Sequence, residues 1–189
     1  MIDLHIHSTY SDGINTPEEI IIAAIDLGYK EIAICDHVRQ TTIWFASFHA
    51  EIEQLKRKYR QYITVYTAVE AKVIPGGLDI KPEFYKADLV YAALHTYPGD
   101  KTEAYRTMLE SRAAAIVHPD PAMLPLLLRH KKPVEINYKH PCSLPKGKFP
   151  LFVGSDSHSV ADMIKSRKFV EEENNELSLL CQRRGLYFL

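Results

Sequence analysis

Cysteine is scarce in this chain, and its spacing forms no recognisable framework. Only three cysteines occur among the 189 residues, and no two of them stand in a CxxC pair. The pattern therefore does not indicate disulfide bonding and fits a reducing compartment. Long apolar runs are also missing, since none approaches the roughly 18 residues of a membrane helix. The first residues lack the basic and apolar segments of a signal peptide. We therefore expect a cytoplasmic protein that binds no membrane.

An excess of charge of one sign is equally absent. The formal net charge is −1 and the pI about 6.8, so no strong overall field favours nucleic acid or acidic membranes. Small anionic substrates stay compatible, because they need only local positive charge. The content of 46% hydrophobic and 25% charged residues is that of a globular protein and excludes disordered, collagen-like and coiled-coil chains. We expect one domain over residues 1–189; the sequence does not indicate its oligomeric state.

Short apolar runs alternate with helical patterns along the whole chain. The runs have the length of strands and end in a polar residue. The predicted strands are Ile2–His7, Glu31–Asp36, Ile63–Glu70, Asp88–His95, Ala114–His118, Pro133–Asn137 and Leu151–Asp156. A capping box at Thr16, with Pro17 at the first helical position, begins a helix that Gly28 ends. Further helices are predicted at Phe48–Tyr62, Thr102–Arg112, Pro121–His130, Val160–Phe169 and Glu176–Arg184, the last stopped by Gly185.

This succession favours an α/β fold with a mainly parallel sheet. Seven strand–helix units leave two architectures, a closed barrel or an open doubly wound sheet. No GxGxxG or Walker loop follows the first strand. In barrels the reactive groups gather at the carboxyl ends of several strands, and the polar residues of this chain stand at such positions. The sequence therefore predicts a barrel.

Most of the predicted strands end in side chains that bind metal ions. On the first strand, Leu4 and Ile6 fall on one face and His5 and His7 on the other, so that the two imidazoles can reach one ion. Six of the seven strands finish in His, Asp or Glu, which supply ligands to Zn, Mn or Fe. The residues at these ends are His5, His7, Asp36, His37, Glu70, His95, His118, Asp156 and His158. Histidines scattered through a core are not expected at the same end of successive strands, so we predict a metal centre there.

These residues give the chain a resemblance to the PHP (polymerase and histidinol phosphatase) family of metal-dependent phosphoesterases. The segment DLHIHSTYSDG at residues 3–13 resembles the first motif of the family, and CDH at residues 35–37 the second. ALH at 93–95 and VHP at 117–119 stand where its middle histidines are expected, and GSDSH at 154–158 is similar to its last motif. The resemblance covers essentially the whole chain. It implies a distorted, TIM-like (β/α)7 barrel with two or three divalent ions, of Zn, Mn or Fe, at its carboxyl-terminal mouth.

Carried over by motif, the resemblance also implies which residues hold which ion. The first ion would be held by His5, His7, Glu70 and Asp156. The second would share Glu70 as a bridge and add His95 and His118. The third would use Asp12, His37 and His158. The family often has histidine at the position of Asp12, and aspartate is a known variant.

Other polar residues are candidates for different roles. Arg39, just past the second motif, is predicted to contact phosphate, since guanidinium binds phosphate oxygens in pairs. Asn137, at the end of the sixth strand, and Arg167, on the helix after the last motif, are further substrate-binding candidates. Asp36 is interpreted as an orienting or capping residue rather than a ligand. Three histidines that match no motif are predicted to lie on the surface: His49, His130 and His140.

The predicted chemistry is hydrolysis of a phosphate ester by a metal-activated hydroxide, because no GxSxG elbow or Cys–His pair indicates a side-chain nucleophile. A small phosphomonoester fits the near-neutral charge. A nuclease or nucleotide phosphatase of the same family is an alternative, for which Tyr10, Trp44, Phe45 and Phe48 are stacking candidates; nucleic acid is not favoured. An amidohydrolase and a noncatalytic metal-binding regulatory module are the alternatives from other classes.

Overall fold

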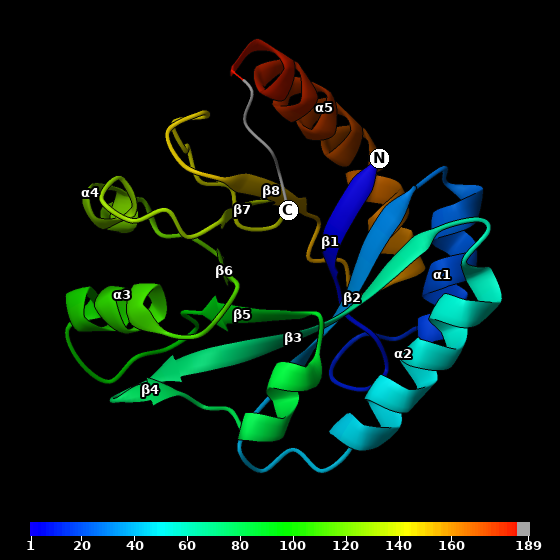
Figure 1. The fold of residues 1–189 in the computed structure, drawn as a ribbon, viewed down its shortest axis with the longest axis horizontal. Helices are drawn as coiled ribbons and strands as arrows, with labels where there is room; N and C mark the ends of the chain where they lie inside the picture. Colours follow the sequence, from blue (N-terminus) through cyan, green and yellow to red (C-terminus); the bar gives the residue numbers. More distant parts are fainter. Residues whose placement is uncertain (185–189) are drawn as a thin grey trace.

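A parallel sheet runs through the molecule in the order in which its strands occur in the chain (Figure 1). The computed structural model describes residues 1–184, and the eight strands found there belong to one sheet. They are β1 (Ile2–Ile6), β2 (Glu31–Val38), β3 (Thr64–Ile74), β4 (Gly77–Leu78), β5 (Leu89–Ala93), β6 (Ala115–Val117), β7 (Val134–Asn137) and β8 (Leu151–Gly154). The short β4 pairs antiparallel with the last residues of β3, while the other pairings are parallel. Seven of the eight strands match the predicted ones, and β4 was not predicted.

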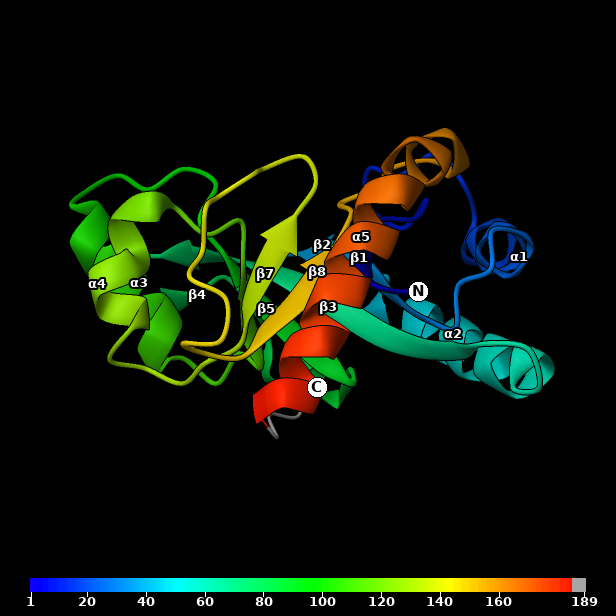
Figure 2. The same cartoon turned by 90° about the horizontal axis from the view of Figure 1, so that it is seen from above.

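The first and last strands meet, so the sheet curls almost into a closed barrel (Figure 2). The amide of Asp156 donates to the carbonyl of His5 at 2.9 Å, and the amide of His7 donates to the carbonyl of Ser157 at 2.8 Å. These two bonds join the chain just beyond β8 to the end of β1. The predicted α/β barrel is thereby confirmed, and the residues that close it belong to the first and last motifs.

Helices cover the outside of this sheet. They are α1 (Pro17–Asp26), α2 (Phe45–Tyr59), α3 (Lys101–Glu110), α4 (Leu124–Leu127) and α5 (Val160–Arg184), with 3₁₀ turns at Pro82–Lys86 and Pro121–Met123. The predicted capping box is present, because the Thr16 hydroxyl accepts from the Glu19 amide and the Glu19 carboxylate accepts from the Thr16 amide. No helix of the described residues combines the length and the apolar content that a bilayer crossing needs.

The predicted break between two C-terminal helices is wrong, since α5 is continuous. Asn174 lies where the sequence suggested the interruption. Its side chain accepts from the Ile2 amide at 3.1 Å and donates to the Ile2 carbonyl at 2.8 Å. Although asparagine is a weak helix former, Asn174 thus connects α5 to the first residue of β1. Gly185, the predicted stop, lies outside the described residues.

The predicted helix Pro121–His130 is also only partly formed. It consists of the 3₁₀ turn Pro121–Met123 followed by the single turn of α4. Pro125 lacks an amide hydrogen, which weakens a longer helix at this point.

Two apolar clusters hold the sheet. The larger one lies between the strands and the helices, and the smaller one fills the inside of the barrel with small residues such as Ala33, Cys35 and Ala68, together with Tyr91 and Phe152. Because side chains alternate along a strand, Cys35 shares its face with His37 on β2, and Ala68 shares its face with Glu70 on β3. The small apolar side chains inside the barrel thus pack directly beneath the polar cluster.

The expected simple alternation on β1 does not hold. Its pairing with β2 shifts register between Asp3 and Ile6. Leu4 consequently packs in the inner cluster and Ile6 in the outer one, although both were predicted on one face.

A candidate metal centre at the mouth of the barrel

The nine residues predicted to bind metal lie together at the carboxyl ends of the strands. Within the described part of the chain, five groups have donor atoms within 4.8 Å of one another. They are His5, His7 and Asp156; His5, Glu70 and His118; His37, Glu70 and His95; His7, Asp12, His37 and His158; and His118, His140 and Asp156. Each group offers three or four nitrogen and oxygen donors, as transition-metal ions require.

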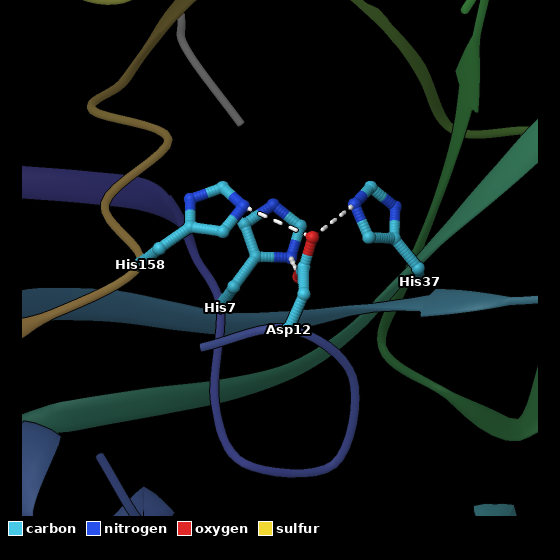
Figure 3. A group of neighbouring side chains, drawn as sticks. All are labelled: His7, Asp12, His37 and His158. Carbon is cyan, nitrogen blue, oxygen red and sulfur yellow. Dashed lines mark ion pairs between the residues drawn. The ribbon is translucent and has the colours of Figure 1, made fainter. Parts of the chain in front are cut away.

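Asp12 is the centre of the group drawn in Figure 3. Its Oδ2 lies 3.4 Å from Nε2 of His37 and 3.3 Å from Nε2 of His158, and its Oδ1 lies 3.7 Å from Nδ1 of His7. Burial opposes ionisation of the half-exposed carboxyl, but the charges of His37, His7 and His158 hold the pKa of Asp12 below its usual value. Three imidazoles from separate parts of the chain therefore converge on one carboxylate.

The loop that carries Asp12 is fastened by the buried carboxylate of Asp36. Oδ1 of Asp36 accepts from the Ser8 amide at 2.9 Å and from the Ser11 hydroxyl at 2.6 Å, while Oδ2 accepts from the Ser8 hydroxyl at 2.6 Å. Gly13 lets the loop close tightly, since a Cβ at this position would lie 2.4 Å from the carbonyl oxygen of His7. Asp36 belongs to none of the five donor groups and acts on the loop instead.

Glu70 links several of the groups through one buried carboxylate. Its Oε1 lies 2.7 Å from Nε2 of His95, and its Oε2 lies 3.2 Å from both Nε2 of His5 and Nδ1 of His37. Burial alone would raise the pKa of Glu70, but the adjacent imidazoles of His37, His5 and His95 hold it well below the ordinary value. The side chain is therefore an ionised carboxylate with both oxygens directed at histidines.

His118 and Asp156 have backbone conformations that residues with a Cβ rarely adopt. Their φ angles are +50° and +56°, in the left-handed region. This geometry brings Nε2 of His118 to 3.5 Å from Oδ2 of Asp156, whose Oδ1 lies 3.1 Å from Nε2 of His7. Burial opposes ionisation of Asp156, but the adjacent imidazoles of His118 and His7 hold its pKa far below the usual value. Backbone strain of this kind concentrates at functional sites.

Several donor atoms of the cluster are buried without a hydrogen bond of good geometry. They are Nδ1 of His7, Nδ1 of His37, Nε2 of His118 and Oδ1 of Asp156. A buried polar atom that stays unpaired costs about 1–3 kcal/mol, which makes such a concentration unfavourable by itself. Divalent metal ions are the partners that imidazole nitrogens and carboxylate oxygens suit, so the residues present fit them.

Glu135 is a residue of the candidate site that the sequence analysis missed. This buried side chain on β7 holds its Oε1 2.7 Å from Nδ1 of His5, and its Oε2 accepts from the His118 amide at 3.0 Å. Burial opposes ionisation, but the charge of His5 keeps the pKa of Glu135 low. Orienting carboxylates of this kind fix the ring nitrogen that faces a metal. The sequence signal was an acid inside the apolar strand VEIN.

Gly154 leaves the space that Glu135 occupies. A Cβ on Gly154 would lie 2.0 Å from Oε1 of Glu135 and 2.8 Å from Cβ of His5. Only glycine fits at this position without displacing the carboxylate. The glycine of the last motif is therefore required by the side chain of a neighbouring strand.

His140 is exposed, as predicted, but it also borders the cluster, which the sequence analysis did not anticipate. Its ring centroid is 4.4 Å from that of His118, and its Nε2 lies 3.5 Å from Oδ2 of Asp156. The neighbouring Asn137 is buried, and its Oδ1 accepts from the His140 amide at 2.8 Å. In this structure Asn137, predicted to bind substrate, shapes the loop that carries His140.

The two arginines predicted to bind substrate point elsewhere in this structure. The guanidinium of Arg39 donates to the Val38 carbonyl at 2.7 Å and lies 3.8 Å from Asp79, beyond the β3–β4 hairpin. Arg167 donates to the Leu27 carbonyl at the end of α1 at 3.1 Å. Neither arginine is among the residues that line the cavity over the cluster.

That cavity has a volume of about 1040 Å³ and opens over the histidines. Its floor includes His37, His118, Asp156 and His158, and its walls are the loops that follow β5, β6 and β7. Two lining residues are cationic, Lys101 and Lys139. The volume leaves room for a phosphoryl group on the cluster and a small organic group beside the loops.

Comparisons with known proteins identify a family and solved structures with a similar fold. The PHP domain family matches residues 3–187. A histidinol phosphate phosphatase of Lactococcus lactis, solved with zinc, L-histidinol and phosphate, shares 18% identity and a TM-score of 0.62, over 90% of this chain and 92% of that one. A candidate histidinol phosphatase of Listeria monocytogenes shares 16% identity and a TM-score of 0.63, over 89% and 99%.

Among curated sequences, the DNA polymerase/3′-5′ exonuclease PolX of Bacillus subtilis is 31% identical over 103 residues. The matched region is 50% of this chain but only 18% of that relative.

Proposed function

Because the chain belongs to the PHP domain family and is thereby a metal-dependent phosphoesterase, we propose that it hydrolyses a small phosphomonoester at the mouth of its barrel. The observation that carries this proposal is the position of Glu70. One buried carboxylate lies within 3.2 Å of ring nitrogens of His5, His37 and His95, which suits it to be shared between neighbouring ions. The family membership also favours a phosphoesterase over the amidohydrolase alternative.

The proposed ligand sets follow the donor groups. His5, His7, Glu70 and Asp156 would hold the first ion; Glu70, His95 and His118 the second; and Asp12, His37 and His158 the third. The donor groups His5, His7 and Asp156, and His7, Asp12, His37 and His158, support the first and third sets. For the second set, Glu70 is grouped with His118 in one case and with His95 in another, and His140 is grouped with His118 and Asp156. Zinc is the metal to test first, because the Lactococcus lactis protein was solved with it, and manganese and iron follow.

When bound, ions at such a site neutralise negative charge on the phosphate oxygens and lower the pKa of water to near neutrality. Residues of the chain hold the proposed ligands in position. Glu135 holds His5 with Nε2 toward the cluster, and Asp36 holds the loop of Asp12. Among the described residues that line the cavity there is no serine or cysteine, and the histidines and Asp156 of the lining are adjacent to the proposed ions, so the nucleophile in this proposal is water.

A nuclease is the second candidate, and the match to PolX is the observation in its favour. The cavity favours the smaller substrate, because the described residues that line it include only two lysines and no arginine. A groove that follows a nucleic-acid strand typically carries a row of cations and stacking aromatics. Tyr10, Trp44 and Phe48 pack on one another. Neither these three nor Phe45 lines the cavity, whose aromatic lining residue apart from the histidines is Tyr97.

The experiment compares substrates on one preparation of defined metal content. The protein is loaded with zinc, manganese or iron, and release of phosphate is measured from p-nitrophenyl phosphate and from a panel that includes histidinol phosphate. Bis-p-nitrophenyl phosphate, dinucleotides and oligonucleotides are measured in parallel, and Glu70→Gln serves as the inactive control. Turnover of diesters at a higher kcat/KM than any monoester would replace the proposal by the nuclease alternative.

A further inference from the structure

Lys139 is the cationic side chain that reaches the cluster itself. It lies two residues beyond the end of β7, and the amide of its neighbour Tyr138 donates to the Gly154 carbonyl at 3.1 Å. Its ammonium lies 2.8 Å from Nδ1 of His158 and 3.6 Å from Oδ2 of Asp162. The side chain is about one-third exposed and lines the large cavity together with Asp156 and His158.

The contact between Lys139 and His158 depends on which ring nitrogen carries hydrogen. Nδ1 of His158 also lies 2.8 Å from the carbonyl oxygen of Asp156, to which it can only donate. Nε2 of the same ring faces Asp12 in the group of Figure 3. If Nε2 binds an ion, the hydrogen of the neutral ring stays on Nδ1. Nδ1 then donates to the Asp156 carbonyl and offers no lone pair to Lys139.

Lys139 therefore loses its nearest acceptor when the centre is filled. The remaining anion near it is Asp162, which already accepts from the His158 amide at 3.2 Å and lies 3.9 Å from the ammonium of Lys165. An ammonium at the edge of a cavity that receives a phosphate dianion has a stronger partner available there. The other cation of the cavity, Lys101, is two-thirds exposed and pairs with Asp120 at 3.2 Å, farther out on the wall.

We propose that the ammonium of Lys139 binds a phosphoryl oxygen of the substrate beside the ion held by Asp12, His37 and His158. The inference rests on the proposed function for the identity of the substrate as a phosphate ester. It adds a contact that the sequence analysis assigned to Arg39 and Arg167. In this structure Lys139, and not either arginine, lies against the cluster.

Binding of inorganic phosphate to the metal-loaded protein tests this contact without turnover. Lys139→Met should weaken phosphate binding about 10- to 100-fold by calorimetry, the effect of removing one hydrogen bond to a charged group. Lys139→Arg should restore most of the affinity, because it keeps the charge. Lys165→Met is the matched control, since this lysine shares Asp162 but does not line the cavity. The metal content of all variants is measured alongside and should equal that of the wild type.

Three results would overturn the inference. One is phosphate affinity of Lys139→Met within twofold of the wild type. Another is loss of an ion from Lys139→Met, which would show that the lysine orients His158. The third is a metal-loaded wild type that does not bind phosphate. A wild type that binds phosphate through Lys139 but hydrolyses no phosphomonoester would sink the proposed substrate and leave this contact standing.

Discussion

Glu135→Gln is expected to release metal from the centre although Glu135 is not itself a predicted ligand. Its carboxylate oxygens lie 2.7 Å from Nδ1 of His5 and 3.0 Å from the His118 amide. A carboxylate can accept from both, whereas a glutamine has one accepting oxygen and one donating amide. The His118 amide can only donate, so it takes the oxygen. The glutamine amide group is then left facing Nδ1 of His5.

His5 can relieve this conflict only at the expense of metal binding. If Nδ1 accepts from the glutamine, the hydrogen of the neutral ring moves to Nε2, which is the nitrogen that faces Glu70. A protonated Nε2 is not a ligand. If Nδ1 keeps its hydrogen, two buried donors oppose each other at a cost of about 1–3 kcal/mol. Either way we expect the affinity of the first ion to fall about 10- to 100-fold, which corresponds to roughly 1.4–2.7 kcal/mol.

The assay is a chelator titration that follows each ion released from Glu135→Gln and from the wild type. Glu51→Gln is a suitable control, because Glu51 binds the Tyr10 hydroxyl away from the cluster. The ion of the Asp12 group should stay bound in both variants. An unchanged metal affinity of Glu135→Gln would refute the argument that Glu135 fixes the ring of His5.

Four further changes test the remaining parts of the centre. Gly154→Ala should destabilise the protein by about 1–3 kcal/mol in thermal or urea unfolding, while Gly77→Ala, whose Cβ meets nothing within 4 Å, should not. Asp36→Asn should weaken the ion of the Asp12 group first, since an amide nitrogen cannot accept from Ser8 or Ser11; a metal titration in which all ions leave together would contradict this. Glu70→Gln should damage two sites and nearly abolish kcat, and full activity would disprove the bridge. Asp12→Asn should weaken only the third ion and leave activity that recovers at high metal concentration; loss of every ion would disprove the division.

The fold and the convergence of eight of the nine predicted ligands follow from one property of parallel sheets, whereas Asp12, in the loop after β1, was implied only by the family resemblance. Carboxyl ends of parallel strands meet at one edge, so a histidine or acid at the end of each apolar run predicts a shared site without any knowledge of contacts. His95 and His118 stand at the ends of β5 and β6, and the structure brings both to Glu70. Their role as metal ligands stays a prediction until an ion is measured.

The positions of side chains in the loops beyond the strand ends could not be predicted in this way. Arg39 was placed at the mouth because it follows His37, but the unpredicted β3–β4 hairpin brings Asp79 beside it. His140 lies three residues beyond β7, where no periodicity indicates direction; its amide donates to Asn137, and its ring lies against that of His118. In both cases a contact distant in the sequence or made in a loop decides where the side chain points.

The roles of Glu135 and Gly154 can be recognised only when the two residues are considered together. Separately, an acid inside an apolar strand looks like an error in the strand assignment, and a glycine at a strand end looks like a turn. Together, on the adjacent strands β7 and β8, the glycine makes room for the carboxylate, and the carboxylate sets the ring of His5. A shorter acid at position 135 should leave room for a larger residue at position 154. The double variant Glu135→Asp, Gly154→Ala should therefore unfold at a higher temperature than Gly154→Ala alone, because the carboxylate of the shorter side chain lies farther from the new Cβ. If the double variant is no more stable than the single one, the clash between these two residues is not what makes Gly154 necessary.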